Sequence, residues 1–275
     1  MAAYSASLII SFYNKLEYLK MLEAALECQS FKGFEVIIAD DGSKTEVVNG
    51  ITELMETSTL AFQHCWHEDL GFRKTKILNQ AIRQSRSNYL IFIDGDCIPH
   101  KHFIAEHVNN RSLGSVLAGR RVNLSERISK QLKTELIKKG QLESIKFAFQ
   151  LMLDSLIGKT THAERGIFIR NSFLRNLVNK KIKGVLGCNF SIHKTDLKAI
   201  NGFDVRYQAP AVGEDTDIEL RLRWLGIKIR MIKNMAIQYH LYHKKLEREQ
   251  ANQKILELVI AGNKYFTPFG LKQEK

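Results

Sequence analysis

The sequence has few of the residues that divide a chain into separate modules: 3 proline and 4 cysteine residues among 275. With proline only at positions 99, 210 and 268, it has no proline-rich linker, and we expect one domain with additions. The cysteines are widely spaced and form no Cys-x-x-Cys pair, so the sequence indicates neither a disulfide framework nor a zinc cluster. A reducing compartment fits this cysteine content best.

Long apolar runs are also missing. No stretch reaches the ~20 apolar residues of a membrane span, and the best run, residues 147–158, is short and contains Asp154. No basic segment precedes the first apolar run, so we expect no secretory signal. The sequence therefore predicts a cytoplasmic protein, at most peripheral on the inner face of the plasma membrane.

Positive charge is concentrated in one segment. The formal net charge is +12, and residues 120–183 hold fifteen Lys and Arg against five Asp and Glu, a local net charge of +10. Such a segment favours a phosphate-bearing partner: nucleic acid, anionic lipid or a phosphorylated substrate. A solvated helical face without a partner is the alternative.

The first 100 residues alternate between short apolar runs and helical periodicity. Strands are predicted at 8–11, 34–39, 61–66 and 89–93, with helices around 16–26, 46–55 and 74–86. This order is typical of a mostly parallel α/β sheet with helices on both faces. Ligands of such sheets bind at the carboxyl ends of the strands, where polar clusters lie here.

From residue 125 onward the sequence no longer alternates regularly between strands and helices. Residues 125–156 are helical with a break at Gly140, and turns and short runs follow residue 183. We predict a helix at about 215–225, a strand at 229–232 and a last helix at about 244–261.

Three acidic clusters carry the chemistry. Asp94-Gly95-Asp96 ends the most convincing strand and offers hard oxygen ligands to Mg²⁺ or Mn²⁺, although a strand-ending turn is an equal alternative. Asp40-Asp41-Gly42-Ser43 can accept a uracil N–H or ribose hydroxyls, or form a turn with Ser43 capping a helix.

The third cluster is Gly213-Glu214-Asp215-Thr216-Asp217, which opens a helix. The helix dipole alone would stabilise these acids, but two adjacent carboxylates exceed what capping requires. Downstream, His240 and His243 share one face if the segment is helical, whereas a strand end would separate them.

The order of these pieces resembles family 2 glycosyltransferases, which have the GT-A fold and use nucleotide-diphosphate sugars. The resemblance covers residues 8 to about 243. Within it, Gly71–Arg73 and the stretch from Asn201–Asp204 to Gly213–Asp215 are most similar to the bacterial chondroitin-polymerase type and to the galactosyltransferase C-terminal half. The matching segments are Leu8–Asn14, Asp40–Ser43, Gly71–Arg73 with Asn79–Ala81, Asp94–Asp96, Gly187–Ser191, Asn201–Asp204 and Gly213–Asp215. The usual proline near Ser11 or Phe12 is absent, which is a small change at a strand end. The tryptophan that precedes Gly213 in many galactosyltransferases is also absent, which leaves the donor sugar open.

The resemblance implies a Rossmann-like nucleotide-binding sheet, a helical insertion and a C-terminal helix in a single GT-A domain. Within residues 1–275 it implies a nucleotide-sugar-binding half at 1–119, a basic helical insertion at 120–183, an acceptor and catalytic half at 184–243, and a C-terminal helix and tail at 244–275. It also implies an inverting hexosyl- or N-acetylhexosaminyltransferase that uses a UDP-sugar and Mn²⁺ or Mg²⁺.

By the same resemblance, each site residue has an expected role. Asp215 would be the catalytic base and Glu214 would bind the sugar or acceptor. The metal would be held by Asp96, with Asp94 and His240 as further ligands and His243 in reserve. The donor would be held by Ser11, Tyr13, Asp40, Asp41, Arg73, Asp94 (at the ribose) and Asn189 (at the sugar, from a glycine-flanked turn).

Two other functions remain open from the sequence. A metal-dependent nucleotidyltransferase would want a glycine-rich basic loop after the first strand, but residues 11–15 contain no glycine. A catalytically silent nucleic-acid- or membrane-binding protein would use the basic helices, but no nucleic-acid motif is present. By analogy we expect a glycan or lipid-linked acceptor in lipopolysaccharide, capsule or other surface-polysaccharide synthesis. The basic segment, including Lys130, Lys133, Lys138 and Lys139, would meet that acceptor or an anionic membrane.

Overall fold

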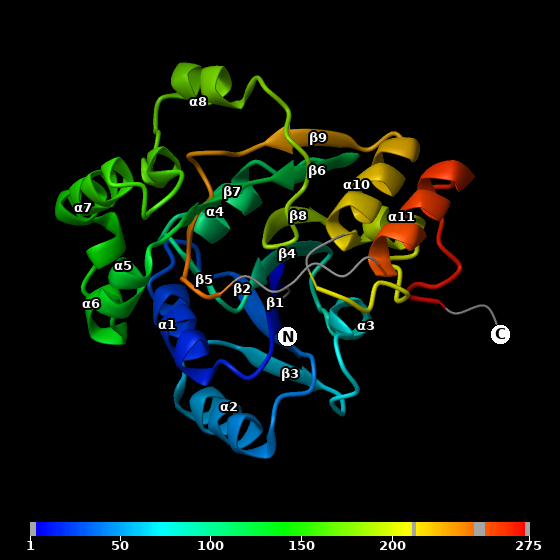
Figure 1. The fold of residues 1–275 in the computed structure, drawn as a ribbon, viewed down its shortest axis with the longest axis horizontal. Helices are drawn as coiled ribbons and strands as arrows, with labels where there is room; N and C mark the ends of the chain where they lie inside the picture. The colour runs from blue at the N-terminus through cyan, green and yellow to red at the C-terminus, as the bar shows by residue number, and fades with distance from the viewer. Residues whose placement is uncertain (1–3, 211–212, 245–250, 273–275) are drawn as a thin grey trace.

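The computed structural model describes residues 4–210, 213–244 and 251–272. Its centre is a seven-stranded sheet in the order β3-β2-β1-β4-β8-β6-β9 (Figure 1). All of its neighbouring strands run parallel except β8, which is antiparallel to both β4 and β6. The strands are β1 (Ala6–Phe12), β2 (Phe34–Asp40), β3 (Phe62–Trp66), β4 (Tyr89–Asp94), β6 (Ser115–Ala118), β8 (Asn189–His193) and β9 (Lys228–Met231).

Helices cover both faces of this sheet, as the alternating pattern predicts. Leu8 and Ile10 of β1 point into the core beneath α1 (Leu16–Glu27) and α2 (Thr45–Thr57). Ile9 points the opposite way, into the core formed with α3 (Lys74–Gln84), α9 (Lys194–Ala199) and α10 (Glu214–Trp224). Because both faces are buried, these strands read as continuous apolar runs. The predicted α/β fold is confirmed.

A second, three-stranded sheet was not predicted. It has the order β5-β10-β7, where β5 is Cys97–Pro99, β7 is Arg120–Asn123 and β10 is Ile237–His240. The strands have three or four residues each, too few for a periodic signal. The sheet brings residues 97–99, 120–123 and 237–240 together across more than 100 positions of sequence.

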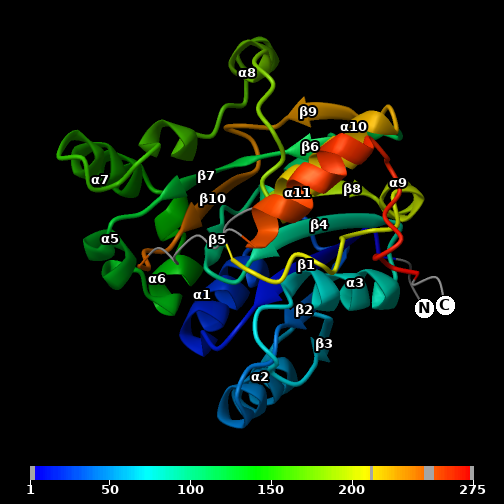
Figure 2. The ribbon, with the colours of Figure 1, turned by 45° about the vertical axis from the view of Figure 1, so that its right-hand side comes forward.

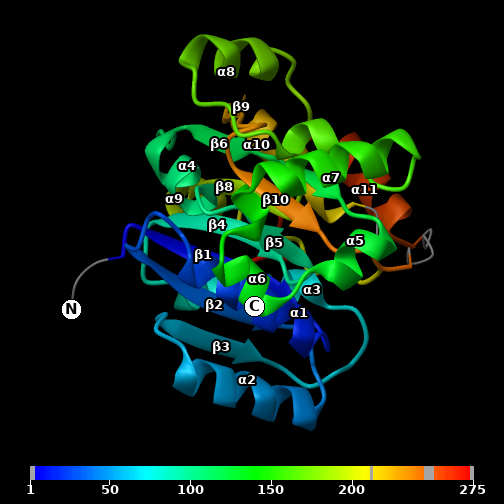
Figure 3. The same ribbon diagram turned by 90° about the vertical axis from the view of Figure 1, so that its left-hand side faces the viewer.

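The basic segment is less uniformly helical than expected. Its first four residues form β7, so the helical insertion begins only at Glu126. Gly140, with φ +80°, breaks the helical run as predicted. The elements that follow β7 are α5 (Glu126–Gln131), α6 (Thr134–Lys138), η1 (Gln141–Glu143), α7 (Ile145–Leu156), η2 (Ala163–Gly166) and α8 (Ser172–Asn179). In Figure 3, α5, α6 and α7 form a group beside the small sheet, and α8 stands apart from them.

Another helix, α4 (Phe103–Asn109), precedes β6, and α11 (Ala251–Gly262) runs beside α10 (Figure 2). The sequence predicts that the last helix begins near Lys244. Lys244 is not helical, and residues 245–250 lie outside the described residues. After α11 the chain returns to the loop at Asn201, where the Leu271 N–H donates to the Asn201 carbonyl over 2.7 Å. Among the described residues, no helix combines the length and apolar character that crossing a bilayer requires.

Candidate active site

The predicted polar clusters meet at one edge of the large sheet. In the parallel register, Ser11 pairs with both Ala39 and Asp94, so the ends of β2, β1 and β4 lie side by side. The Gly95 N–H donates to the Ser11 carbonyl over 2.8 Å. A Cβ at Gly95 would lie 3.1 Å from that carbonyl oxygen and 3.0 Å from the Phe12 ring, so the close approach of the two chains favours glycine there.

Asp41 directly follows β2, at the part of this edge where the nucleotide is expected. One carboxylate oxygen contacts His67 Nε2 at 2.8 Å, and the other accepts the Arg73 backbone N–H at 2.8 Å. Burial raises the pKa of Asp41, against the opposing effects of these two partners. Beside it, the half-exposed Tyr13 donates its hydroxyl to Asp69 over 2.9 Å. Asp41 therefore contacts both His67 and Arg73, and Tyr13 lies near enough to feel the charge of Asp41.

Asp40 has a different position from the one we expected. Its side chain is fully buried, one oxygen accepts both the backbone N–H and the hydroxyl of Ser43, and the other contacts His64. The Asp40 side chain has no exposed surface, whereas that of Asp41 is 11% exposed, so Asp40 fixes the turn after β2 and does not face a ligand. Ser43 does not cap α2 either, since Lys44 precedes that helix and supplies no side-chain cap. The turn alternative is right for Asp40, but the helix-cap alternative is wrong.

Asp96, His240 and His243 form the candidate metal centre. One ligand atom from each lies within 4.8 Å of the others, and among the described residues these three form the single cluster of this kind. His243 Nε2 is 3.2 Å from Asp96, and His240 Nε2 is 3.5 Å from it. Burial would raise the pKa of Asp96, but the two imidazoles outweigh burial and lower it; Asp96 in turn raises the pKa of His243.

The small sheet explains why the histidines meet. β10 runs antiparallel to β5 with His240 opposite Cys97, so His240 lies next to the end of β4. The Leu241 N–H then donates to the Asp96 carbonyl over 2.8 Å. His240 is therefore at a strand end, yet His243 is not separated from it, because the chain turns back and places the two Nε2 atoms 3.2 Å apart. The expectation that a strand end would separate them is wrong.

Asp94 is not part of this trio. It contacts Lys74 Nζ at 3.0 Å, and the same ammonium lies 3.8 Å from Glu214. The Lys74 side chain is only 16% exposed. Burial would lower its pKa, but Asp94, Glu214 and Asp215 outweigh burial and raise it. Lys74 thus links the end of β4 to the start of α10, a contact that we did not predict.

Asp215 lies in the first turn of α10, where its carboxylate accepts the Gly187 N–H over 2.8 Å. Burial and the neighbouring Glu214 raise the pKa of Asp215 to about 6, while Lys74 and the Gly187 N–H oppose the shift. A carboxylate with such a pKa is mostly ionised at neutral pH yet far more basic than an ordinary aspartate. It meets the requirement for a general base that works near neutrality.

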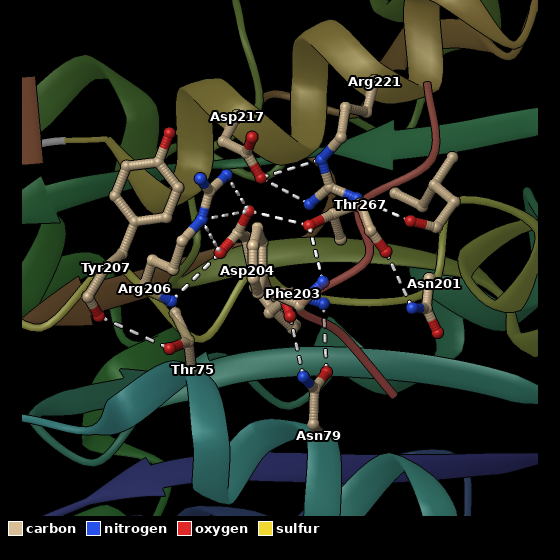
Figure 4. Close-up of polar contacts among 12 residues, drawn as sticks. Thr75, Asn79, Asn201, Phe203, Asp204, Arg206, Tyr207, Asp217, Arg221 and Thr267 are labelled. Carbon is tan, nitrogen blue, oxygen red and sulfur yellow. Dashed lines mark hydrogen bonds and ion pairs between the residues drawn. The ribbon is translucent and has the colours of Figure 1, made fainter. Parts of the chain in front are cut away.

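A buried polar network holds α10 in place (Figure 4). Asn79 of α3 exchanges two hydrogen bonds with the Phe203 backbone, at 2.7 and 3.0 Å. Next to it, the Asp204 carboxylate accepts from Arg206 and from the hydroxyl of Thr267, which belongs to the C-terminal tail. On α10 itself, Arg221 binds Asp217 and the Ile200 carbonyl. Ile200, directly before the Asn201–Asp204 motif, therefore connects this loop to α10.

The expectation that Asn189 lies in a turn at the donor sugar is wrong. This residue begins strand β8 and does not lie in a turn, and its side chain is fully buried. Its amide donates to the Arg120 and Ala236 carbonyls, and its oxygen contacts His107 Nε2 at 3.1 Å. In this structure Asn189 joins the two sheets and has no exposed surface for a donor sugar.

A cavity of about 540 Å³ is lined in part by Tyr242, which lies between His240 and His243 in the sequence. Its other lining residues are Ser125, Glu126, Arg127, Lys130 and Lys159. Glu126 pairs with Lys130, and Arg127 pairs with the buried Asp154, so Lys159 supplies the excess positive charge of the lining. This cavity is formed by the start of the basic insertion.

Comparisons with known proteins identify the family and the fold. Residues 7–198 match the model of glycosyl transferase family 2, and residues 173–244 match that of the N-terminal domain of galactosyltransferase. Chondroitin synthase from Escherichia coli is 23% identical over 240 residues, which are 85% of this chain and 34% of that protein. The chain thus spans about a third of the length of this relative.

Two solved structures share the fold. TarS 1-349 from S. aureus, in complex with UDP-GlcNAc, has a TM-score of 0.58 at 18% identity, over 94% of this chain and 65% of that one. Mannosyltransferase PcManGT from Pyrobaculum calidifontis, in complex with GDP-Man and Mn²⁺, has a TM-score of 0.55 at 15% identity, over 89% and 60% of the two chains. The fold is the GT-A fold.

Proposed function

The chain belongs to glycosyl transferase family 2, and we propose that it transfers a hexose or N-acetylhexosamine from a UDP-sugar to a hydroxyl group of a glycan or glycolipid. The observation that carries the proposal is the meeting of three features at one sheet edge. These are the Asp96-His240-His243 trio, the nucleotide-side group around Asp41, and Asp215 with its raised pKa.

In this proposal the nucleotide lies across the ends of β1 and β2. Asp41 accepts the uracil N–H, Tyr13 and Ser11 lie along the uridine, and Arg73 lies near the base or diphosphate. These assignments follow the ligand position expected for parallel sheets. Asp94 would meet the ribose, and its carboxylate is paired with Lys74.

A divalent cation fits the trio. Two imidazoles and one carboxylate make a donor set that suits Mn²⁺ better than Mg²⁺, which prefers oxygen ligands throughout. When bound, such a cation neutralises the charge that develops on a departing nucleoside diphosphate. Asp96, His240 and His243 would hold it, so both histidines are proposed as ligands.

Asp215 is the proposed base. Its carboxylate takes the proton of the acceptor hydroxyl as that oxygen bonds to the anomeric carbon, and the carbon–oxygen bond to UDP breaks with the electron pair leaving on UDP. Attack opposite the leaving group inverts the anomeric centre, so an α-linked donor gives a β-linked product. Glu214, held by Lys74, would bind the sugar or the acceptor.

The acceptor would approach past Tyr242 from the cavity of the basic insertion. Similarity to a bacterial chondroitin synthase supports a role in assembling a surface polysaccharide such as capsule or lipopolysaccharide. A lipid-linked glycan is an acceptor of this kind.

A donor panel tests the proposal. The protein is incubated with several UDP-sugars and Mn²⁺, with and without EDTA, while UDP release and donor binding are measured. We expect one donor to be bound and slowly hydrolysed, with loss of activity in EDTA and in Asp215→Asn. Glu46→Gln, an exposed change on α2, is the control and should keep full activity. If no UDP-sugar binds or reacts and EDTA changes nothing, the proposed function is wrong.

A further inference from the structure

Helix α8 contacts the rest of the protein through its polar side. Arg175 binds both carboxylate oxygens of Glu106, at 2.6 and 3.0 Å, and donates to the Ile169 carbonyl. One turn later, the Asn179 amide exchanges hydrogen bonds with the Lys233 backbone. These two residues lie on the same face of the helix, which therefore faces the body of the protein.

The apolar side of α8 faces outward. Phe173 and Leu177, four residues apart, are 72% and 50% exposed, and Leu174 beside them is 46% exposed. A surface helix normally turns its apolar stripe toward the core. Here no residue of α8 is buried, and Figures 1 and 3 show the helix at the edge of the molecule.

Helix α7 has a second outward apolar stripe. Its inner side packs through Phe147 and Leu151, which are buried. Along its outer side, Ile145, Phe149 and Leu156 are 89%, 64% and 81% exposed, with Met152 and Leu153 half exposed between them. In the described part of the chain, nothing covers either stripe.

Positive charge borders both stripes. Lys146 follows Ile145 on α7, and Lys180, Lys181 and Lys183 follow α8 directly, without an acidic residue between them. The two acids between residues 145 and 183, Asp154 and Glu164, lie beside Arg127 and Arg165 respectively. A second copy of this chain seated on the same surface would bring like charges together. The charge instead complements an anionic surface.

We propose that the outward faces of α7 and α8 form a docking surface for an anionic lipid bilayer. The apolar side chains enter the boundary between headgroups and acyl chains, and the bordering lysines contact anionic headgroups, as in other interfacial helices. This proposal does not depend on the sugar-transfer reaction, since binding to vesicles is measured without donor or acceptor.

The test is co-sedimentation of the full chain with vesicles of equal parts phosphatidylglycerol and phosphatidylcholine, and with phosphatidylcholine alone. We expect binding to the anionic vesicles, weakened on going from about 50 mM to about 500 mM salt because counterions screen the lysines. Phe173→Ser with Leu177→Ser should weaken binding about tenfold or more, from the lost burial of two apolar side chains. Ile145→Ser with Phe149→Ser should do the same.

Matched controls separate the surface from general effects. Leu258→Ser changes a 67% exposed leucine on α11 and should bind as wild type. Changing Lys180, Lys181 and Lys183 to Glu should abolish binding, whereas the same change at the exposed Lys198, Lys228 and Lys264 alters net charge equally and should keep most of it. Because the apolar targets are exposed, urea unfolding of each variant should match wild type.

Three results would overturn the proposal. One is no binding of the wild type to anionic vesicles at low salt. Another is wild-type binding by either apolar double variant. The third is a wild-type dimer in light scattering that either double variant dissociates, which would make the surface a contact between two copies of this chain.

Discussion

Asp215→Asn should greatly slow transfer and stabilise the protein at the same time. The carboxylate is held at the start of α10 by burial and by Glu214, at a pKa of about 6 against an ordinary value of 3.8. Asparagine keeps the shape and can still accept the Gly187 N–H, but carries no charge to be desolvated. An ionised group held in an unfavourable environment is a typical cost of a catalytic site.

The size of the stabilisation follows from linkage. A native pKa of about 6 and an unfolded value of 3.8 differ by roughly two units, or about 3 kcal/mol at most. Because the native pKa is the higher one, this residue's stability contribution is complete below pH ~4 and is lost as pH rises through ~6. Wild type and variant should therefore unfold alike near pH 4, and the variant should be up to ~3 kcal/mol more stable above pH 7.

Urea unfolding of both proteins between pH 4 and pH 8 measures this difference in stability. UDP-sugar binding and the rate of sugar transfer measure the effect on activity. We expect donor binding to persist and transfer to fall at least 10²-fold, the usual size of a general-base effect. Equal stabilities at every pH would show that Asp215 is not destabilised when ionised. Full activity in the variant would assign the base elsewhere, with Glu214 the first candidate.

Four further substitutions test other residues of the site and its support. Lys74→Met removes the cation that favours ionised Asp215, so the acid limb of the rate profile should move up by about one pH unit; an unmoved limb would contradict that role, and Lys74→Arg is the control. His240→Ala and His243→Ala should each raise the Mn²⁺ concentration needed for activity, by roughly tenfold or more, and a variant with wild-type dependence would remove that histidine from the centre. Thr267→Val deprives the buried Asp204 of a 2.7 Å hydrogen bond and should lower the free energy of unfolding by about 1 kcal/mol; Thr59→Val, at an exposed hydrogen bond, should cost little.

The alternation of strands and helices in the first 100 residues was readable from the sequence because each element is long enough to show its period. Strand β4 and its Asp94-Gly95-Asp96 ending lie where the pattern predicts, and the register then places Asp94 beside Ser11. The small sheet was not readable. Its strands are three or four residues long, and pairing across more than 100 residues leaves no local signal.

The same contrast holds within the site. Asp96 and both histidines were named from residue type and order, but that they converge depends on the β5–β10 register. Lys74 was missed although it carries a signal: it lies in the same helical stripe as the buried Ile77, Leu78 and Ala81, where a cation requires a partner. Asp40 and Asn189 have side chains that could bind a donor, but both are fully buried and make their hydrogen bonds within the protein.

Titration of Mn²⁺ followed by electron paramagnetic resonance, with UDP present, tests the central claim most directly. The proposed centre predicts one bound Mn²⁺ per chain in the wild type, and loss of both this ion and Mn²⁺-dependent UDP binding in Asp96→Ala. The exposed Glu46→Ala is the matched control and should behave as wild type. Unchanged Mn²⁺ stoichiometry and UDP affinity in Asp96→Ala would contradict the account.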